Sequence, residues 1–430
     1  MRDFLPADVR RRRYVIGVVE EVYRRYGFEP LETPALENID TLTGQYGEEG
    51  AKLIFKVLRR GEHEGSGETD LALRYDLTVP LARVVAEHRG KLPRFFKRYQ
   101  IQPVWRADRP ARGRFREFYQ CDVDAIGSRS AVVETELCAA CAEVLKALGF
   151  GDFAIRLNHR QLLSGLLDAV GVPEVLHAST LVALDKLDKI GADGVRQELS
   201  ARGLAADAAS GVLAAFGEEA GLPDLERRVG DRAAARSALA ELAQILEWST
   251  ATAATGHVRL DPSLARGLSY YTGAIMEVAV PDLAGSLGGG GRYDGLIGVF
   301  SGEQIPACGF SLGLERILVV MAERGMFPAG VDAAPADVMV TLFDSGSVPD
   351  ALHLAGELRR AGLRVLVYPE PDKLGKQFKY AAAAGVPRVA ILGADERAGG
   401  FVTIKEMQSG EQTQVPRGEL SARLAGPNQR

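Results

Sequence analysis

Two stretches near residue 100 alternate apolar with polar residues and therefore predict neighbouring β-strands. In YQIQPVWR (99–106) aromatic and aliphatic residues alternate with polar ones, and FREFYQCDVD (115–124) alternates less strictly. The segment between them, ADRPARGR, is polar and contains Pro110 and Gly113, which favour a turn. The pattern predicts an antiparallel hairpin with a basic tip.

One face of the second predicted strand is too polar for a core. Side chains two apart share a face, which groups Arg116, Phe118, Gln120, Asp122 and Asp124 on one side. The tip adds further arginines, namely Arg106, Arg109, Arg112 and Arg114. A solvated face with salt bridges is the ordinary interpretation. Guanidiniums so close together repel one another unless an anion lies among them, so we favour a phosphate site at the tip. The acidic groups on the same face could hold an ammonium or an imidazolium.

Helical periodicity occupies much of the remaining chain. Amphipathic helices are predicted over 6–26 and 131–150, and an alanine- and leucine-rich stretch broken by glycines, about 161–250, predicts a helical insertion. After a linker at 330–335, strand and helix patterns alternate and predict a small, mainly parallel sheet. A lysine patch in this last part, at 373–379, is either functional or an ordinary solvated face.

Several polar residues lie where predicted elements meet. Asp76 and Thr78 lie between a strand and a helix, where one of them caps the helix or both hold an ammonium. Tyr270 and Tyr271 are predicted to begin a strand, so that alternation places at most one in the core. Gly288–Gly291 predicts a bulged strand, and Arg316 falls in the first turns of a helix.

Composition narrows the function classes. The chain has 430 residues and is 46% hydrophobic, which allows two or three domains. Its net charge of −5 gives no sign of nucleic-acid binding, so any such contact must come from local basic patches. We expect no signal peptide and no membrane span. Cys138 and Cys141 have the spacing of a metal-binding pair, but they lie in a helical pattern and are expected to be buried thiols. The usage of the four cysteines indicates a reducing cytoplasm, and the scattered histidines suggest no metal site built from side chains.

Five segments resemble the class II aminoacyl-tRNA synthetases and specifically the histidyl-tRNA synthetase family, and they follow one another in the order expected of that family. FEPLETPALE, residues 95–127 and GFSLGLER resemble the three motifs of the class, and RGLSYYTG and GGGGRYDGL resemble two histidine-specific elements. The resemblance implies an α/β (α+β) fold: a catalytic domain at 1–329 with an antiparallel sheet of six-stranded type flanked by helices, the insertion at about 161–250, and an α/β anticodon-binding domain at 330–430. It also implies a cytoplasmic homodimer.

The family's chemistry has two steps. The carboxylate of L-histidine attacks the α-phosphorus of ATP, which is bound with Mg²⁺, and the histidyl group then passes to the 3′ end of tRNA(His). Positioning and charge neutralisation carry the rate. The resemblance assigns catalysis to Arg106 and Arg266; ATP binding to Arg106, Asp108, Arg114, Phe118 and Arg316; and histidine binding to Asp76, Thr78, Gln120, Asp124, Arg266, Tyr270, Tyr271 and Tyr293.

Two alternatives come from other function classes or substrates. One is a catalytically inactive paralogue that regulates an ATP phosphoribosyltransferase in histidine biosynthesis; such paralogues tend to lack the anticodon-binding domain and the Arg266 element, and both are present here. The other is a synthetase for a different amino acid, against which RGLSYYTG argues. Ser269 replaces the aspartate that this element commonly carries.

Overall fold

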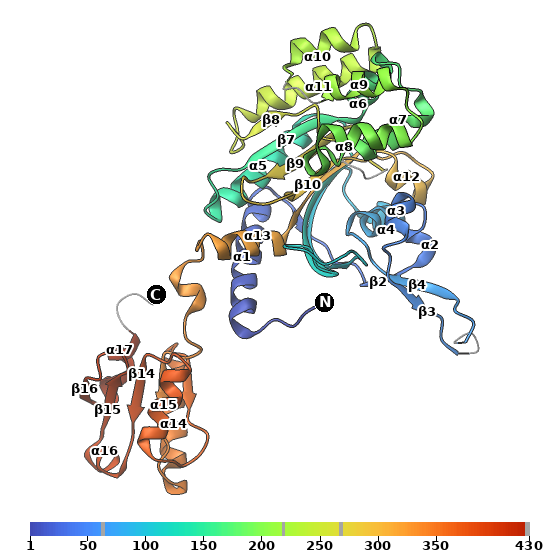
Figure 1. Ribbon diagram of the computed structural model, residues 1–430. Coiled ribbons are helices and arrows are strands. Elements are labelled where there is room, and N and C mark those ends of the chain that lie inside the picture. The colour runs from blue at the N-terminus through green and yellow to red at the C-terminus, as the bar shows by residue number, and fades with distance from the viewer. Residues whose placement is uncertain (62–64, 217–219, 266–269, 426–430) are drawn as a thin grey trace. The chain divides into compact units, whose positions relative to one another are not determined.

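The computed structural model describes residues 1–61, 65–216, 220–265 and 270–425. The chain divides into two compact units, Met1–Phe327 and Pro328–Arg430 (Figure 1). Each unit has hydrophobic clusters of its own, a large one in the first and two smaller ones in the second.

An eight-stranded sheet forms the centre of the first unit. Its order is β1 (Glu29–Pro30), β5 (Phe96–Trp105), β6 (Glu117–Ile126), β11 (Ala307–Gly313), β10 (Ser286–Arg292), β9 (Ala274–Ala279), β7 (Ala154–His159) and β8 (Val258–Leu260). The six strands from β5 to β7 are antiparallel, and one short parallel strand is added at each edge. The predicted antiparallel sheet and its β5–β6 hairpin are confirmed.

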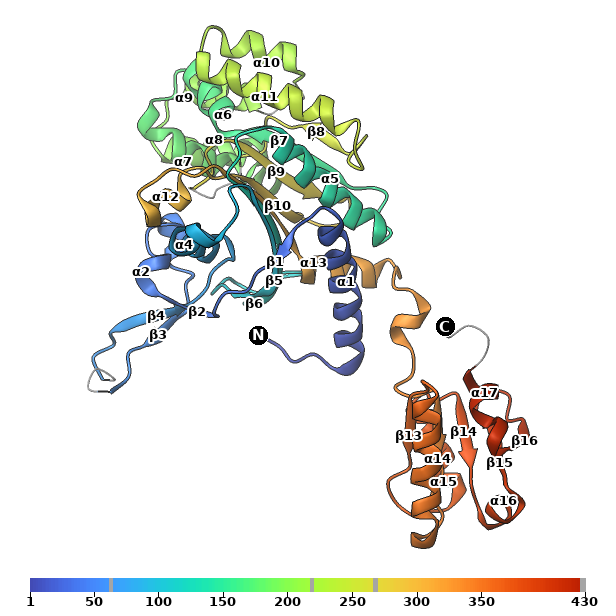
Figure 2. The same cartoon turned by 180° about the vertical axis from the view of Figure 1, so that it is seen from behind.

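Helices cover both faces of this sheet. On one face lie α1 (Pro6–Arg25), α5 (Val132–Ala147) and α13 (Leu314–Glu323), which contact one another or the strands beneath (Figure 2). On the other face lie α2 (Ile39–Leu42), α3 (Gly47–Ala51), α4 (Thr78–His88) and α12 (Leu296–Ser301). In α1 the buried Val15, Val19 and Val22 form the stripe that the helical period predicts. All four cysteines are buried free thiols, which confirms the prediction made for Cys138 and Cys141.

The predicted insertion is a helical layer at one end of the sheet. It comprises α6 (Arg160–Ala169), α7 (Glu174–Leu184), α8 (Leu187–Ala201), α9 (Ala206–Phe216), α10 (Leu222–Val229) and α11 (Ala233–Ser249). Helix α11 packs on α6 and also on α5 and β7, which attaches the insertion to the sheet. In the described part of the chain no single helix is long and apolar enough to cross a membrane; α6 and α7 meet that test only as a pair, bent by 112°.

The second unit has a mixed rather than a mainly parallel sheet. Its order is β13 (Val365–Val367), β12 (Val338–Val340), β14 (Arg388–Ile391), β15 (Phe401–Glu406) and β16 (Gln412–Pro416), with helices α14 (Val348–Arg360), α15 (Leu374–Ala383), α16 (Ala394–Gly399) and α17 (Leu420–Ala425). The first three strands are parallel, as predicted. The last two pair antiparallel because short connections return the chain directly, whereas a parallel pair needs a long crossover.

A buried arginine ties a small accessory sheet to the central one. The accessory sheet contains β2 (Leu36–Asn38), β4 (Thr69–Leu73) and β3 (Lys56–Leu58). Just after β4, the Arg74 side chain donates to the carbonyls of Pro103 (2.8 Å) and Thr33 (2.5 Å) and to Gln102 Oε1 (2.9 Å). Burial lowers the pKa of Arg74 to about 10. This side chain therefore fixes the entry to α4 relative to the end of β5.

Arg74→Ala is expected to lower the free energy of unfolding of the first unit by about 2–4 kcal/mol, because several buried acceptors lose their donor together. Urea unfolding measures the change. Arg59→Ala is the control, since the ion pairs of Arg59 with Glu68 and Asp70, among the residues that the structure describes, are exposed and should be worth no more than about 1 kcal/mol. Equal effects of the two substitutions would contradict the role given to Arg74.

Candidate active site

A polar cavity opens over the middle strands of the central sheet. Twelve of the thirteen expected site residues line it: Asp76, Thr78, Arg106, Asp108, Arg114, Phe118, Gln120, Asp124, Tyr270, Tyr271, Tyr293 and Arg316. The thirteenth, Arg266, lies outside the described residues, as does Ser269. These twelve residues come from segments up to 240 positions apart, and the sheet brings them to one place.

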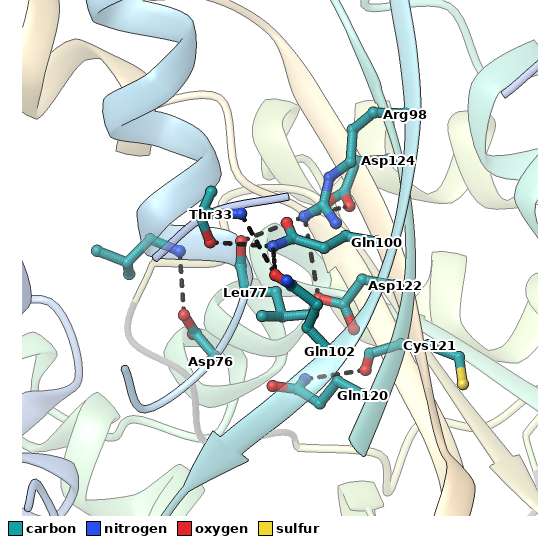
Figure 3. A network of polar contacts seen from close by, with 12 residues as sticks. Thr33, Asp76, Leu77, Arg98, Gln100, Gln102, Gln120, Cys121, Asp122 and Asp124 are labelled. Atoms are coloured by element: carbon teal, nitrogen blue, oxygen red, sulfur yellow. Dashed lines mark hydrogen bonds and ion pairs between the residues drawn. The ribbon is translucent and has the colours of Figure 1, made fainter. Parts of the chain in front are cut away.

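Strand register explains the polar floor of the cavity. Phe118, Gln120, Asp122 and Asp124 all line it, as the alternation along β6 predicts. On the neighbouring strand β5, the residues directly opposite are also polar: Arg98 faces Asp124, Gln100 faces Asp122 and Gln102 faces Gln120. Opposed side chains lie about 5 Å apart. Arg98 contacts both Asp122 and Asp124, and Gln100 Nε2 donates to Gln102 Oε1 (2.7 Å), so this face carries a continuous layer of polar side chains (Figure 3).

Arg98 is the charged centre of this polar layer and was missing from the expected site. The side chain is fully buried, and its Nη2 lies 2.9 Å from Asp124 Oδ2 and 4.0 Å from Asp122 Oδ2. Nη2 also donates to the Leu77 carbonyl (3.3 Å). Pairing β5 with β6 in register would have found this residue, because the same alternation that selects Asp124 selects the position opposite it.

Burial dominates the titration of the two carboxyls beside Arg98. Burial raises the pKa of Asp122 to about 7, although Arg98 lowers it, and nearby Asp124 raises it further. Burial likewise raises the pKa of Asp124, with Arg98 and the Tyr293 hydroxyl acting in the opposite direction. Tyr293 donates to Asp124 Oδ1. The floor is thus a pair of acids that share one guanidinium.

Asp76 caps helix α4, which is one of its two expected roles, and its carboxylate also lines the cavity. Its Oδ1 accepts from the Val79 N–H (3.0 Å) in the first turn of α4 and from the Tyr46 hydroxyl (3.1 Å), while Oδ2 accepts from the Tyr270 hydroxyl (3.3 Å). Burial raises the pKa of Asp76. The carboxylate therefore caps the helix and also lines the cavity.

The two tyrosines lie outside the strand on which they were predicted. Strand β9 begins at Ala274, so Tyr270 and Tyr271 belong to the preceding turn, where alternation does not apply. Their rings meet edge to face at 5.0 Å, and Tyr270 also approaches Tyr293 at 6.1 Å. Both line the cavity, whereas strict alternation would have separated them.

The other end of the cavity is basic. The Arg106 guanidinium lies 4.3 Å from the Tyr75 ring centre and 5.2 Å from that of Phe118, and its Nε donates to the Tyr75 carbonyl. Arg114 pairs with Asp108 at 3.7 Å. Arg316, in the first turn of α13, donates to the Ser286 carbonyl.

The prediction that five arginines cluster around an anion at the hairpin tip is only partly correct. Arg106 and Arg114 line the cavity, but Arg109, Arg112 and Arg116 are not among its lining residues. Arg112 pairs with Glu323 and donates to the Asp282 carbonyl (3.0 Å), and Arg116 donates to the Asp108 carbonyl (3.3 Å). Acceptors in the protein itself relieve the repulsion between the guanidiniums at the tip. At the cavity, Arg316 of helix α13 joins Arg106 and Arg114.

Glycines make room for this arrangement. A Cβ on Gly309 would lie 1.8 Å from Asp124 Oδ1, and one on Gly290 would lie 2.0 Å from the Gly309 carbonyl oxygen. Strand β10 carries the predicted irregularity, a register shift between Ser286 and Gly288. Any side chain at Gly309 would therefore displace the Asp124 carboxyl.

A second buried pair supports the basic end. Glu315 lines the cavity next to Arg316, and its Oε1 accepts from Arg12 Nη1 of helix α1 (2.7 Å) while Oε2 accepts from the Tyr119 N–H (2.9 Å). Nothing in the local pattern of α1 predicts that Arg12 reaches α13, because the contact spans 303 positions. The pair anchors the first turn of α13, which carries Arg316.

The geometry therefore suits a ligand with an anionic part and a cationic part. Arginines at one end would neutralise phosphates or a carboxylate, and carboxylates at the other would hold ammonium or imidazolium groups. Within the described residues, no group of three or more His, Cys, Asp or Glu side chains is arranged to hold a metal ion.

Comparisons with known proteins agree along the whole chain. A family model for histidyl-tRNA synthetase matches residues 1–317, and one for an anticodon binding domain matches residues 337–426. A histidine–tRNA ligase of Gloeobacter violaceus is 43% identical over 454 residues, which cover 99% of this chain and 97% of the relative. The histidyl-tRNA synthetase structure from Nostoc sp. PCC 7120 superposes with a TM-score of 0.81 at 31% identity, covering 98% of this chain and 97% of that one.

A further solved structure shares the fold alone. It is described as an ATP phosphoribosyltransferase regulatory subunit/histidyl-tRNA synthetase from Bacillus halodurans, and it superposes with a TM-score of 0.74 at 24% identity, covering 91% of this chain and 96% of that one.

The Asp122 carboxyl predicts a pH-dependent stability. An unfolded aspartate titrates near pH 4, whereas the folded pKa is about 7. The folded state therefore stays protonated at Asp122 to a higher pH than the unfolded state does. The stabilisation that results is full below pH 4 and is lost as the pH rises through 7. Asparagine cannot ionise, so Asp122→Asn does not suffer this loss. The free energy of unfolding of the variant minus that of the wild type should therefore rise between pH 5 and pH 7, by about 1.4 kcal/mol per pH unit at most. Urea unfolding at several pH values measures this difference, and a difference that does not change with pH would refute the assignment.

Proposed function

The chain belongs to the histidyl-tRNA synthetase family, and we propose that the cavity over its central sheet is where ATP and histidine meet. Its activity is that of a histidine–tRNA ligase: it activates L-histidine with ATP to histidyl-adenylate and transfers the histidyl group to the 3′ end of tRNA(His). The observation that carries the proposal is the convergence of twelve separated residues into one cavity with a basic and an acidic end.

ATP is proposed to occupy the basic end. Arg106 holds the α-phosphate and the histidine carboxylate together, which brings the nucleophile to the phosphorus and neutralises the charge that develops there. Its contacts with Tyr75 support this role, because they hold the guanidinium in one orientation. Arg114 and Arg316 meet the β- and γ-phosphates, Phe118 stacks on the adenine, and Asp108 lies near the exocyclic amine.

Histidine is proposed to occupy the acidic end. Asp76, Thr78 and Gln120 bind the α-ammonium group, and Asp124 and Tyr271 contact the imidazole nitrogens, with Tyr270 and Tyr293 beside them. Gln120 supports this assignment: its Nε2 donates to Ser311 Oγ (2.9 Å), while its Oε1 has no hydrogen-bond partner among the described residues and is available to an ammonium. Arg266 would complete the site at the α-phosphate and act as the second catalytic arginine.

Mg²⁺ is proposed to enter with ATP. The carboxylates that line the basic end already balance arginines, Asp108 with Arg114 and Glu315 with Arg12. The triphosphate oxygens would therefore hold the cation, which would neutralise phosphate charge. No side chain is assigned as a metal ligand.

We propose that the two units have different functions, catalysis in the first and anticodon binding in the second. Residues 1–329 form the catalytic domain, with the insertion at about 161–250, and residues 330–430 bind the anticodon. The separate cores of the two units support this division. The enzyme is proposed to act as a cytoplasmic homodimer. The regulatory paralogue is not favoured, because the chain retains the anticodon-binding unit and the residues that line the cavity.

Asp124→Ala is expected to raise the KM for histidine about 10- to 100-fold in ATP–pyrophosphate exchange, which is the value of a hydrogen bond to a charged group, while the KM for ATP changes little. Asp152→Ala is the control, because Asp152 is an exposed carboxylate paired with Arg324. An unchanged KM for histidine would remove Asp124 from the imidazole site.

A chain that ends at Phe327 should keep histidine-dependent exchange and lose most tRNA charging, because the described residues of the proposed ATP and histidine site all belong to the first unit. Exchange and aminoacylation are measured on the same preparation, and circular dichroism checks the fold. Full charging by the shortened chain would contradict an anticodon-binding role for the second unit.

A further inference from the structure

Asp122 lines the cavity, yet none of the roles above uses it. The residue is 2% exposed, and its Oδ1 has no hydrogen-bond partner among the described residues. It lies on the same face of β6 as Gln120 and Asp124, and it shares Arg98 with Asp124 (Figure 3). Ser311 gives this carboxyl a side-chain hydrogen bond, and Arg98 is its distant cation. A buried carboxylate with so little compensation is costly unless a ligand balances its charge.

The buried charges of the acidic end do not balance by themselves. Within the described part of the site, the carboxylates of Asp76, Asp122 and Asp124 are each 2% exposed, and the fully buried Arg98 is their guanidinium. Two negative charges therefore remain when all three acids are ionised. The other titratable groups that face them are the neutral hydroxyls of Tyr46, Tyr270 and Tyr293, whose pKa values burial raises, and the Arg106 guanidinium towards the basic end. Tyr23 of α1 and Cys121, whose pKa values burial also raises, lie on the other face of β6, and Arg74 lies outside the cavity on Pro103, Thr33 and Gln102.

We propose that Asp122 is a specificity-determining residue that makes the site bind histidine with its imidazole ring protonated. The inference rests on the proposed histidine site. The α-ammonium compensates one of the two negative charges, and an imidazolium compensates the other. A neutral ring would leave one buried negative charge without a partner, so the ring takes up a proton from solvent as it enters, and no bond to carbon or phosphorus changes. Arg106 takes the substrate carboxylate, and Arg266 is proposed to meet the α-phosphate, so both lie outside this balance.

The proposal predicts proton uptake on binding. At pH 8 the free imidazole is neutral, because its pKa is about 6.5, and Asp122, with a pKa of about 7, is ionised in the empty site. Binding histidine with a charged ring therefore takes up nearly one proton from solvent. In Asp122→Asn only one negative charge remains, the ammonium compensates it, and the ring enters neutral with no uptake.

Isothermal titration of histidine into the full-length protein at pH 8, in two buffers of different ionisation enthalpy, counts these protons. The wild type and the exposed-carboxylate control Asp152→Asn should each take up close to one proton, and Asp122→Asn close to none. Equal uptake by all three proteins, or none in the wild type, overturns the proposal. The wild type alone also tests it: at pH 6 both Asp122 and free histidine are largely protonated, so uptake should change to release.

A substrate analogue gives a second readout. Replacing the imidazole by a 1,2,4-triazole leaves a ring of similar shape that is far less basic. Because a neighbouring charge shifts a protonation equilibrium by about 10- to 1,000-fold, Asp122→Asn should reduce the preference for histidine over the triazole, measured as kcat/KM in exchange, by about tenfold or more. An unchanged preference would count against the proposal. Loss of histidine-dependent exchange in the wild type would instead refute the proposed function, so the two failures are distinguishable.

Discussion

A guanidinium buried beneath two carboxylates is the constraint on which the site depends. Arg98 is fully buried on β5, and the register of β5 with β6 sets it opposite Asp124 and within 4.0 Å of Asp122. Removing a charge from water is costly unless a partner is fixed beside it. The backbone of neighbouring strands provides that partner, and Gly309 leaves the space in which the Asp124 carboxyl lies.

The fold turns this constraint into a cavity with two electrostatic ends. The acidic end is built on the sheet floor and on the turn before α4, where Asp76 caps the helix. The basic end combines Arg106 from the hairpin with Arg316 from α13, whose first turn is anchored by the Arg12–Glu315 pair. A reaction between an amino acid and a nucleotide needs its two substrates held side by side, with the carboxylate beside the α-phosphorus. The polarity of the cavity supports that arrangement.

Sequence patterns predicted most of the fold because the strands and helices are strongly periodic. The β5–β6 hairpin, the polar face of β6, the helical insertion and the burial of Cys138 and Cys141 all follow from local alternation or helical spacing. The expected site residues came from motifs rather than from periodicity. What failed depended on tertiary context: Tyr270 and Tyr271 precede their strand, Arg112 turns to Glu323, and the sheet of the second unit is mixed. Arg98 and Arg12 required strand register or long-range contacts that no local pattern contains.

A crystal structure of the full chain with histidine and a non-hydrolysable ATP analogue tests the central claim most directly. The account predicts an imidazole nitrogen within hydrogen-bond distance of Asp124, the ammonium group beside Asp76 and Gln120, and the α-phosphate beside Arg106. An imidazole placed away from the carboxylates over Arg98, or a nucleotide bound outside this cavity, would contradict it.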